Sequence, residues 1–460
     1  MRRDRTYLFR TSASRFVLLC GLMAFLYLVY RLGILGYSVA SLDRNISQLH
    51  GNVAVCSMEG SEHLVDPKPL VSAAYQDTLR RQPALSGNLV ANAEFLQVNN
   101  DTNIPAGFGH SVEADTATYQ YLEDTDKARF LRVMDKREGL PLNDTRPAWL
   151  MSPVAVQPEK TYAYSFQYRS GVPVELVLES TKTTGGMAYR GVTTLPATSV
   201  WRTFTAHFND LEGASSFRPI VTTTQPGYVD IKAFDIHQVL DASLPEGMVT
   251  VTFDDGWESI SSAVPLLQRY DIRTTQYIIS DIAESKLPEY MSFSTLEKLK
   301  KAGHEIGSHS LRHCNQTKLN PQELQDNATQ SKQLLEEKGM GPIRSFAYPL
   351  GQYNQFTQGV YERRFSYIRT SDAGYNDRYF DVANIHSMGV LNTTTDEQFK
   401  AWIDYAKTHK QWLVFVYHRV NESGPYNVTI DQLERQFLMI KESSLKVLPL
   451  SEAADTIVRQ

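Results

Sequence analysis

The hydrophobic and polar positions follow three different patterns along the chain. Residues 16–30 form an uncharged apolar run that comes after five arginines, and residues 32–40 continue apolar beyond Arg31. Residues 85–240 alternate polar and apolar positions in short segments that are separated by turn residues. After residue 245, apolar runs alternate with amphipathic segments of helical period. These patterns predict an N-terminal membrane segment, an all-β region and an α/β region.

The N-terminal segment is typical of an export signal or a membrane anchor. A spanning helix needs about 20 apolar residues, so spanning requires Arg31 to extend its charged end to the membrane surface. A cleaved signal peptide is the alternative, because the small residues at 38–40 suit a cleavage site. We predict an uncleaved transmembrane anchor over residues 16–40, a cytoplasmic basic tail over residues 1–15, and an extracytoplasmic location for everything that follows.

The middle of the chain is predicted to be an all-β sandwich over residues 85–240, which follows a juxtamembrane stalk or short packing helix over residues 41–84. Its opening at 88–95 and its closing at 228–231 look like a jelly-roll carbohydrate-binding module, and a purely structural sandwich fits the pattern equally well. Rings at strand spacing are more often core residues than sugar platforms. The rings that are candidates for stacking on sugar are Trp149, Trp201, Tyr119 and Tyr121.

The last part of the chain, residues 245–460, alternates predicted strands with predicted helices. Residues 248–253 form an apolar run that is typical of a buried strand. Residues 321–338 have helical period, with Asn320 as the expected N-cap and Gly339 as the stop. Such alternation predicts a mainly parallel sheet or barrel, whose active site is built by loops at the carboxyl ends of the strands.

Composition excludes several classes of protein. With 42% hydrophobic and 21% charged residues in 460, the chain has the make-up of ordinary globular domains. A formal net charge of -5 and the absence of a basic cluster in the body of the chain argue against nucleic-acid binding. Only three cysteines occur, with no CxxC pair, so a disulfide scaffold or a thiolate zinc site is not expected. Cys56 and Cys314 are the only possible pair outside the apolar run.

Two adjacent carboxylates end the predicted strand at 248–253. Asp254 and Asp255 are followed by Gly256, and neighbouring side chains on an extended backbone point in different directions. One carboxylate can therefore bind a metal while the other faces a substrate. Taken alone, such a segment is more often only a turn.

A pair of histidines follows in the segment 303–313. His309 and His313 are four residues apart, a spacing that places both rings on one face of a helical turn and lets them reach one ion. Together with one aspartate they complete a two-His, one-carboxylate set with open coordination positions. His304, in the same segment, is expected to pack or hydrogen-bond locally.

One more histidine ends an apolar run at 414–418. In isolation, His418 reads as a structural histidine at the end of a strand. In a site that cleaves amides it gains a role, because an amine leaves poorly unless it is protonated and imidazole titrates near neutral pH.

These motifs resemble the polysaccharide deacetylase superfamily, carbohydrate esterase family 4. The resemblance runs from about residue 248 to residue 450, with the motifs in the family's order. It implies a distorted (β/α) barrel, in agreement with the alternation of strands and helices. The predicted fold class is therefore α/β, with the barrel preceded by the β-sandwich and an N-terminal transmembrane helix. The motifs are 252–256, 303–313, 346–351 and 414–418.

The resemblance also implies roles for individual residues. Asp254 is expected to be the general base and His418 the general acid, and the backbone N–H of Leu350 is expected to help form the oxyanion hole. The cofactor is expected to be a divalent metal, with zinc as the default. The expected metal ligands are Asp255, His309 and His313. The expected substrate contacts are the rings Trp257, Tyr348, Tyr353 and Tyr417.

Two positions depart from the family's pattern. Ala347 stands where many relatives carry an arginine that orients the base, which predicts weaker positioning of the base. Leu350 stands where many relatives carry a tyrosine, and this change should matter less because the main-chain amide makes the contact. The acid that orients His418 stays open. Its candidates are Asp372, Asp377 and Asp381.

The predicted function is metal-dependent removal of N-acetyl groups from an extracytoplasmic polysaccharide, such as poly-N-acetylglucosamine, a chitin-like polymer or peptidoglycan. An O-acetyl esterase that acts on a glycan is the nearest alternative, because an ester uses the same site. A catalytically inactive, glycan-binding surface protein is the second alternative. The expected partners are the polysaccharide and, through the N-terminal helix, the membrane; nucleic acid is excluded.

Overall fold

The computed structural model describes residues 72–459, except 101–103, 112–115, 137–145, 158–159, 210–212 and 224. No helix among these residues is both long enough and apolar enough to cross a bilayer. The predicted transmembrane anchor at 16–40, the basic tail and most of the predicted stalk lie outside the described residues.

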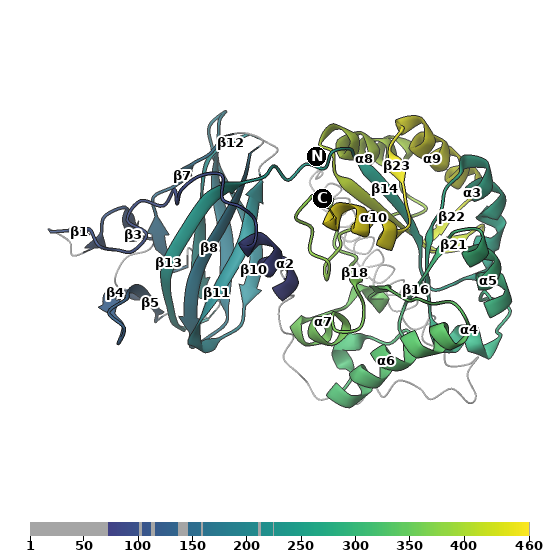
Figure 1. Ribbon diagram of the computed structural model, residues 1–460, viewed down its shortest axis with the longest axis horizontal. Coiled ribbons are helices and arrows are strands. Elements are labelled where there is room, and N and C mark those ends of the chain that lie inside the picture. The colour runs from purple at the N-terminus through teal and green to yellow at the C-terminus, as the bar shows by residue number, and fades with distance from the viewer. Residues whose placement is uncertain are drawn as a thin grey trace, which may run out of the picture. The chain divides into compact units, whose positions relative to one another are not determined.

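The first region is a β-sandwich of two antiparallel sheets, as the alternating pattern predicts (Figure 1). One sheet has the strand order β11-β8-β13-β5-β4, and the other has the order β10-β9-β12-β7. The strands are β4 (Ala117–Glu123), β5 (Arg129–Asp135), β7 (Val154–Ala155), β8 (Thr161–Ser170), β9 (Val174–Lys182), β10 (Met187–Leu195), β11 (Thr198–Asn209), β12 (Ala214–Thr223) and β13 (Gly227–Val239). Short antiparallel pairs are β1 (Val98–Asn99) with β2 (Ile104–Pro105), and β3 (Phe108–His110) with β6 (Trp149–Met151).

Aromatic rings from both sheets fill the space between them. Phe208 on β11 stacks on Phe217 on β12 with ring centroids 4.1 Å apart, which joins the two sheets directly. A short helix, α2 (Ala73–Arg80), begins at the N-cap Ser72 and adds Tyr75 and Leu79 to this core. Within the predicted stalk, the described part is thus a helix that packs on the sandwich.

The rings suggested as sugar platforms have different surroundings. Trp149 is buried and donates its indole N–H to the carbonyl oxygen of Arg132, so it belongs to the core. Tyr119 stacks on His110, and Tyr121 donates its hydroxyl to the carbonyl oxygen of Phe95. Trp201 is only half-buried, but its ring already lies beneath cationic side chains, and nothing in this arrangement assigns it a sugar.

The second region is built on a parallel sheet with the order β18-β17-β16-β15-β14-β20-β19, and β23 pairs with β14. Among the described strands, no pairing joins β18 to β19, so the sheet is an incomplete barrel. The prediction of a barrel agrees with the parallel arrangement of these strands, although the sheet does not close. The strands are β14 (Met248–Phe253), β15 (Thr275–Ile278), β16 (Glu305–Ser308), β17 (Ser345–Ala347), β18 (Tyr367–Arg369), β19 (Met388–Gly389), β20 (Trp412–Tyr417) and β23 (Lys446–Val447).

Helices cover the outside of this sheet (Figure 1). All six residues of β14 and of β20 are buried, as expected for strands covered on both faces. The predicted helix at 321–338 is α6, which starts with a capping box between Asn320 and Glu323 and stops before Gly339, whose φ is 78°. The helices are α3 (Val264–Tyr270), α4 (Ser280–Ser285), α5 (Phe293–Lys301), α6 (Pro321–Glu337), α7 (Gln355–Tyr361), α8 (Asp396–Thr408), α9 (Ile430–Ser443) and α10 (Leu450–Val458). A short parallel pair, β21 (Arg419–Val420) with β22 (Asn427–Val428), follows β20.

Candidate active site and metal centre

The predicted site residues meet at the carboxyl ends of the parallel strands. Asp254 and Asp255 follow β14, His309 follows β16, and His418 follows β20. Because parallel strands end at the same edge of a sheet, residues far apart in the sequence come together there. The sequence-based prediction of one shared site is in keeping with this geometry.

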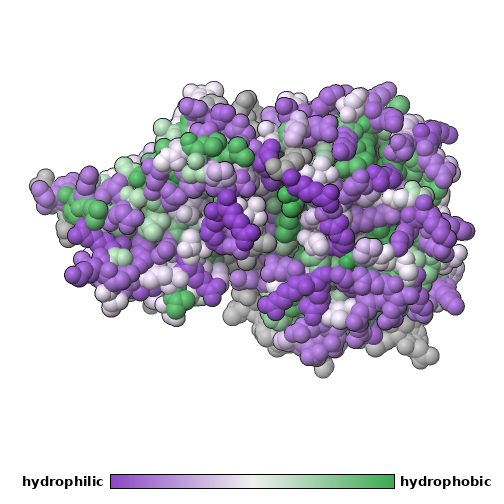
Figure 2. Space-filling model, in the orientation of Figure 1, coloured by the Kyte–Doolittle hydropathy of each residue, from purple (hydrophilic) through white to green (hydrophobic). Residues whose placement is uncertain are grey.

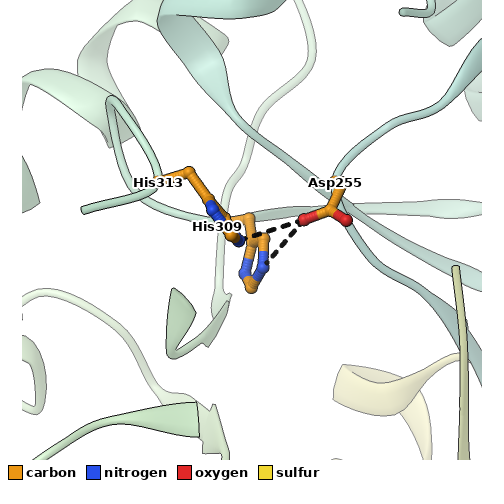
Figure 3. A group of neighbouring side chains, drawn as sticks. All are labelled: Asp255, His309 and His313. Atoms are coloured by element: carbon orange, nitrogen blue, oxygen red, sulfur yellow. Dashed lines mark ion pairs between the residues drawn. The ribbon is translucent and has the colours of Figure 1, made fainter. Parts of the chain in front are cut away.

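Asp255, His309 and His313 form a compact group (Figure 3). Oδ1 of Asp255 lies 3.4 Å from Nε2 of His309 and 3.2 Å from Nε2 of His313. One potential ligand atom from each residue lies within 4.8 Å of the other two. A carboxylate oxygen and two imidazole nitrogens at this separation are a donor set that suits a divalent transition metal.

The surroundings of these side chains fit a bound metal as well. Oδ1 of Asp255 is buried and has no hydrogen-bond partner among the described residues, and its nearest polar neighbours are the two imidazoles, so a cation bound between them would compensate its burial. Nδ1 of His309 donates to the carbonyl oxygen of Ala347 at 2.9 Å, so Nε2 is left as the free lone pair. The indole N–H of Trp257 donates to Oδ2 of Asp255 at 2.9 Å and orients the carboxylate.

The two histidines do not lie on a helical turn, and that detail of the sequence-based prediction is wrong. His309 directly follows β16, and His313 lies in the irregular segment that comes next. Ser310 and His313 have φ of 70° and 54°, which reverses the chain and brings His313 back toward His309. The hydroxyl of Ser310 accepts the backbone N–H of His313 and holds this bend.

The electrostatic setting of the group follows from burial and from mutual contact. Burial raises the pKa of the Asp255 carboxyl, but His313 and His309 outweigh that effect and hold this pKa well below its usual range. Burial lowers the pKa of His313, and the neighbouring Asp255 more than offsets it, so the net shift is upward. Burial also lowers the pKa of His418, which Asp254 and Asp255 offset only in part.

Asp254, the predicted base, has a different partner. Its carboxylate is buried. Nη2 of Arg369 donates to both carboxylate oxygens, to Oδ1 at 2.6 Å and to Oδ2 at 2.5 Å. Arg369 was missed by sequence reasoning. The only available signal was an arginine at the end of an apolar segment at 367–369, and sequence alone does not show which carboxylate such an arginine meets.

His418 lies beside Asp254 but lacks the expected acidic partner. Its Nε2 is 3.9 Å from Oδ2 of Asp254, and its Nδ1 is buried without a hydrogen-bond partner among the described residues. The candidate acids are engaged elsewhere, so none of them orients His418. Asp372 accepts from the hydroxyl of Tyr353, Asp377 from the backbone N–H of Tyr379, and Asp381 from the backbone N–H of Ala383.

Leu350 lies on the short turn Pro349–Gly351, directly after the strand that carries Ala347. Its φ of 58° is in the left-handed region, and its side chain is 61% exposed. The prediction that its backbone N–H takes part in the oxyanion hole is not tested by this geometry.

Burial contradicts the prediction that four aromatic rings contact the substrate. Tyr348, Tyr353 and Tyr417 lie in the hydrophobic core, where they offer no surface to a polymer. Trp257 is buried too, because its ring stacks on Tyr290 with centroids 4.2 Å apart while its N–H binds Asp255. Proximity to a motif in the sequence places a ring near the site, but does not decide which way the ring faces.

A different aromatic ring is available to a ligand. Tyr426, which immediately precedes β22, is 53% exposed, and its ring centroid lies 5.0 Å from that of His418. Its position eight residues after His418 gave no signal in the sequence.

Two neighbouring residues have structural roles. Nδ1 of His304 accepts the backbone N–H of Thr274 at 3.0 Å, which confirms the predicted local hydrogen bond. Cys314, next to His313, is disulfide-bonded. Cys56, the partner expected from the sequence, lies outside the described residues.

Several solved structures are similar to part of this chain at low sequence identity. The deacetylase PplD of Streptococcus pyogenes is 21% identical, with 32% of this chain and 67% of that chain covered and a TM-score of 0.31. The family 4 carbohydrate esterase of Streptomyces lividans is 18% identical, with 44% and 91% covered and a TM-score of 0.32. A CE4 family pseudoenzyme from Bacillus anthracis is 18% identical, with 45% and 65% covered and a TM-score of 0.32.

Sequence comparison gives the family. YxkH of Bacillus subtilis (strain 168), which is named as a polysaccharide deacetylase, is 25% identical over 169 residues, or 36% of this chain. The match spans 60% of the length of YxkH. The polysaccharide deacetylase family model matches residues 241–384, which include Asp254, Asp255, His309 and His313. The chain therefore contains a domain of the polysaccharide deacetylase family.

Proposed function

We propose that this protein is a metal-dependent hydrolase that removes N-acetyl groups from a polysaccharide outside the cytoplasm. The observation that supports this proposal most directly is that the two adjacent carboxylates, Asp254 and Asp255, have different surroundings. Asp255 places Oδ1 close to the imidazoles of His309 and His313, while Asp254 is held by Arg369 next to His418. One carboxylate is thus suited to bind a metal and the other to accept a proton.

The chemistry divides among the residues as follows. When bound, a divalent metal, with zinc as the default, lowers the pKa of a water molecule and polarises the acetyl carbonyl. Asp254 takes a proton from the water as the water oxygen bonds to the acetyl carbonyl carbon. The backbone N–H of Leu350 donates to the oxygen that becomes negatively charged. As the C–N bond breaks, His418 gives its proton to the departing sugar nitrogen, and acetate and a free amine are released.

Two features support an extracytoplasmic location with a membrane anchor. The arginine-rich start and the apolar run at 16–40 have the pattern of an anchor that leaves the basic end inside. The disulfide of Cys314 suits an oxidising compartment, since disulfides rarely persist in the cytosol.

The test is acetate release by the full-length protein in detergent. Chitooligosaccharides, poly-N-acetylglucosamine, peptidoglycan and O-acetylated xylan are compared, with added zinc or with chelator. We expect chelator-sensitive release from an N-acetylated glycan that is lost in Asp254→Asn, while the bound metal stays. Release from xylan alone identifies the O-acetyl esterase instead. No release from any substrate, despite bound metal, supports the inactive glycan-binding protein.

A further inference from the structure

We propose that Arg369 positions the base Asp254, and that this arginine, supplied by β18, takes the place of the one that is absent at Ala347. The inference rests on the proposed function, because it assigns a task within that reaction. Arg369 touches no reacting atom in this account and acts only through Asp254, so it is a positioning residue.

The contact between the two side chains is direct and enclosed. Nη2 of Arg369 lies 2.6 Å from Oδ1 and 2.5 Å from Oδ2 of Asp254. The exposed fraction is 2% for Arg369 and 4% for Asp254. A carboxylate at such a place needs a cation nearby, because water does not solvate it, and a charge-assisted contact to both oxygens fixes its orientation.

Arg369 has no second task among the described residues. Its side chain makes no hydrogen bond there other than those to Asp254, and its Nε is buried without a partner. The guanidinium lies over the ring of Tyr277, with Cζ 5.1 Å from the ring centroid, which limits its movement. An arginine that only tied strands together would be expected to bind backbone carbonyls as well.

The register of the sheet explains why this arginine can replace the missing one. β17 and β18 are parallel neighbours, and Ala347 is paired with Arg369. Paired residues on adjacent strands lie about 5 Å apart, so two long side chains there compete for the same space. Ala347 is fully buried and ends at Cβ, which leaves room for one guanidinium from the next strand. The departure at Ala347 is thus compensated one strand away.

The central test separates positioning from folding. Arg369→Ala is expected to lower kcat about 100-fold or more, since a misplaced base loses most of its contribution, with KM and bound metal little changed. Added guanidinium ions are expected to restore part of kcat. Arg369→Lys keeps the positive charge but has a shorter reach, so its kcat is expected to lie between those of the wild-type protein and Arg369→Ala. The matched control is Arg344→Ala, which removes another arginine that pairs with a carboxylate in the same region and should leave kcat intact.

The relocation has its own test. In the double variant Ala347→Arg/Arg369→Ala, the arginine returns to the neighbouring strand, and kcat is expected to exceed that of Arg369→Ala at least tenfold. A double variant no better than Arg369→Ala overturns the equivalence of the two positions. A kcat within threefold of wild type in Arg369→Lys and Arg369→Ala overturns the positioning role; if the alanine variant does not fold, the lysine variant decides.

A crystal structure of Arg369→Ala, or of Arg369→Lys if the first does not fold, gives a readout that does not depend on activity. The Asp254 side chain is expected to leave its present orientation. An unchanged side chain overturns the proposal even if the wild-type protein proves inactive. Wild-type inactivity with a reoriented Asp254 instead removes the proposed function and leaves the structural dependence on Arg369 standing.

Discussion

The backbone at the site holds side-chain-bearing residues in conformations that ordinarily favour glycine. Asp255, Ser310, His313 and Leu350 have φ between 54° and 70°. A non-glycine residue there costs about 1 kcal/mol or more, and such costs gather at functional sites. For Asp255 and His313 this backbone places a potential ligand atom close to those of the other residues in the group. The side chain of Leu350 is largely exposed, and we propose that this backbone conformation serves to present its N–H.

Leu350→Gly tests that reading of the turn. Glycine adopts a φ of 58° freely and keeps the backbone N–H, so we expect kcat within about threefold of wild type and an unchanged melting temperature. The measurement is acetate release together with thermal unfolding. A loss of tenfold or more with a normal melting temperature indicates that the exposed leucine side chain contacts the substrate.

At the scale of single residues, the sequence predicted chemistry better than orientation. The proximity of Asp255, His309 and His313 agrees with the sequence-based prediction of a two-His, one-carboxylate set. Arg369 was not predictable, because its carboxylate partner is 115 residues away and only the register of the sheet brings the two together. Tyr348 and Tyr417 were wrong as substrate contacts, since adjacency to a motif does not tell which face of a strand or loop a ring occupies.

Among the elements, α10 carries a carboxylate, Asp455, that binds residues at the sheet. Asp455 binds Arg344 through both oxygens at 2.6 Å and 2.7 Å and accepts the hydroxyl of Tyr367. The contact to Arg344 lowers the pKa of Asp455 from 3.8 to about 2. Because the folded pKa is depressed, the stabilisation is fully present above pH 3.8 and is lost as pH falls through about 2.

Asp455→Asn is therefore expected to lower the free energy of unfolding by about 1 kcal/mol at neutral pH, a value kept small because Arg344 is partly exposed. Denaturant unfolding of both proteins between pH 7 and pH 2 gives the difference at each pH. We expect it to shrink as pH falls below 4. A difference that does not depend on pH assigns the loss to packing of α10 rather than to the ion pair.

The exposed segment between β21 and β22 carries Tyr426 to the edge of the site. Its ring lies beside His418, and the backbone N–H of Arg419 donates to its carbonyl oxygen and holds the segment. If a glycan is the substrate, the sugar next to the reacting one has this ring to stack on. An aromatic contact of this kind contributes about 0.5–1.5 kcal/mol.

Tyr426→Ala is thus expected to raise KM for a polymeric substrate about 3- to 10-fold, from that contact energy, and to leave hydrolysis of a small aryl acetate unchanged. Leu438→Ala, which removes an exposed apolar side chain from α9, is the control. Equal effects on the polymer and on the aryl acetate contradict a stacking role and indicate that Tyr426 only supports His418.

Elements were predictable where the local signals agreed with each other. β14 was predictable because residues 248–253 are apolar or β-branched, as is typical of a buried strand. α6 was predictable because Asn320 and Glu323 mark its start and Gly339 marks its end. The histidine pair was misplaced on a helical turn because a spacing of four is ambiguous, and the deciding factor was the left-handed backbone of Ser310, which no residue type announces.

For the whole chain, the change of pattern near residue 245 predicted the two regions, each with its own hydrophobic core. On the face drawn in Figure 2, hydrophilic residues cover most of the surface, as expected for amphipathic helices around a buried sheet. Whether the sandwich binds a glycan was not predictable, since its rings alternate in the sequence whether they fill a core or face outward. Trp149 and Trp201 have the same residue type and different surroundings.

Metal binding should be visible in the stability of the whole molecule. The ligands follow different strands, β14 and β16, so an ion that binds only the folded chain shifts unfolding by mass action. At a metal concentration of 100 times Kd this amounts to about 2.7 kcal/mol. We expect zinc to raise the melting temperature of the chelator-treated protein and of Asp254→Asn, which keeps all three ligands, but not that of Asp255→Asn. The 11 histidines of the chain offer other places for zinc. An equal rise in Asp255→Asn therefore means that the stabilising ion binds elsewhere, and that the metal centre is not the one built on Asp255.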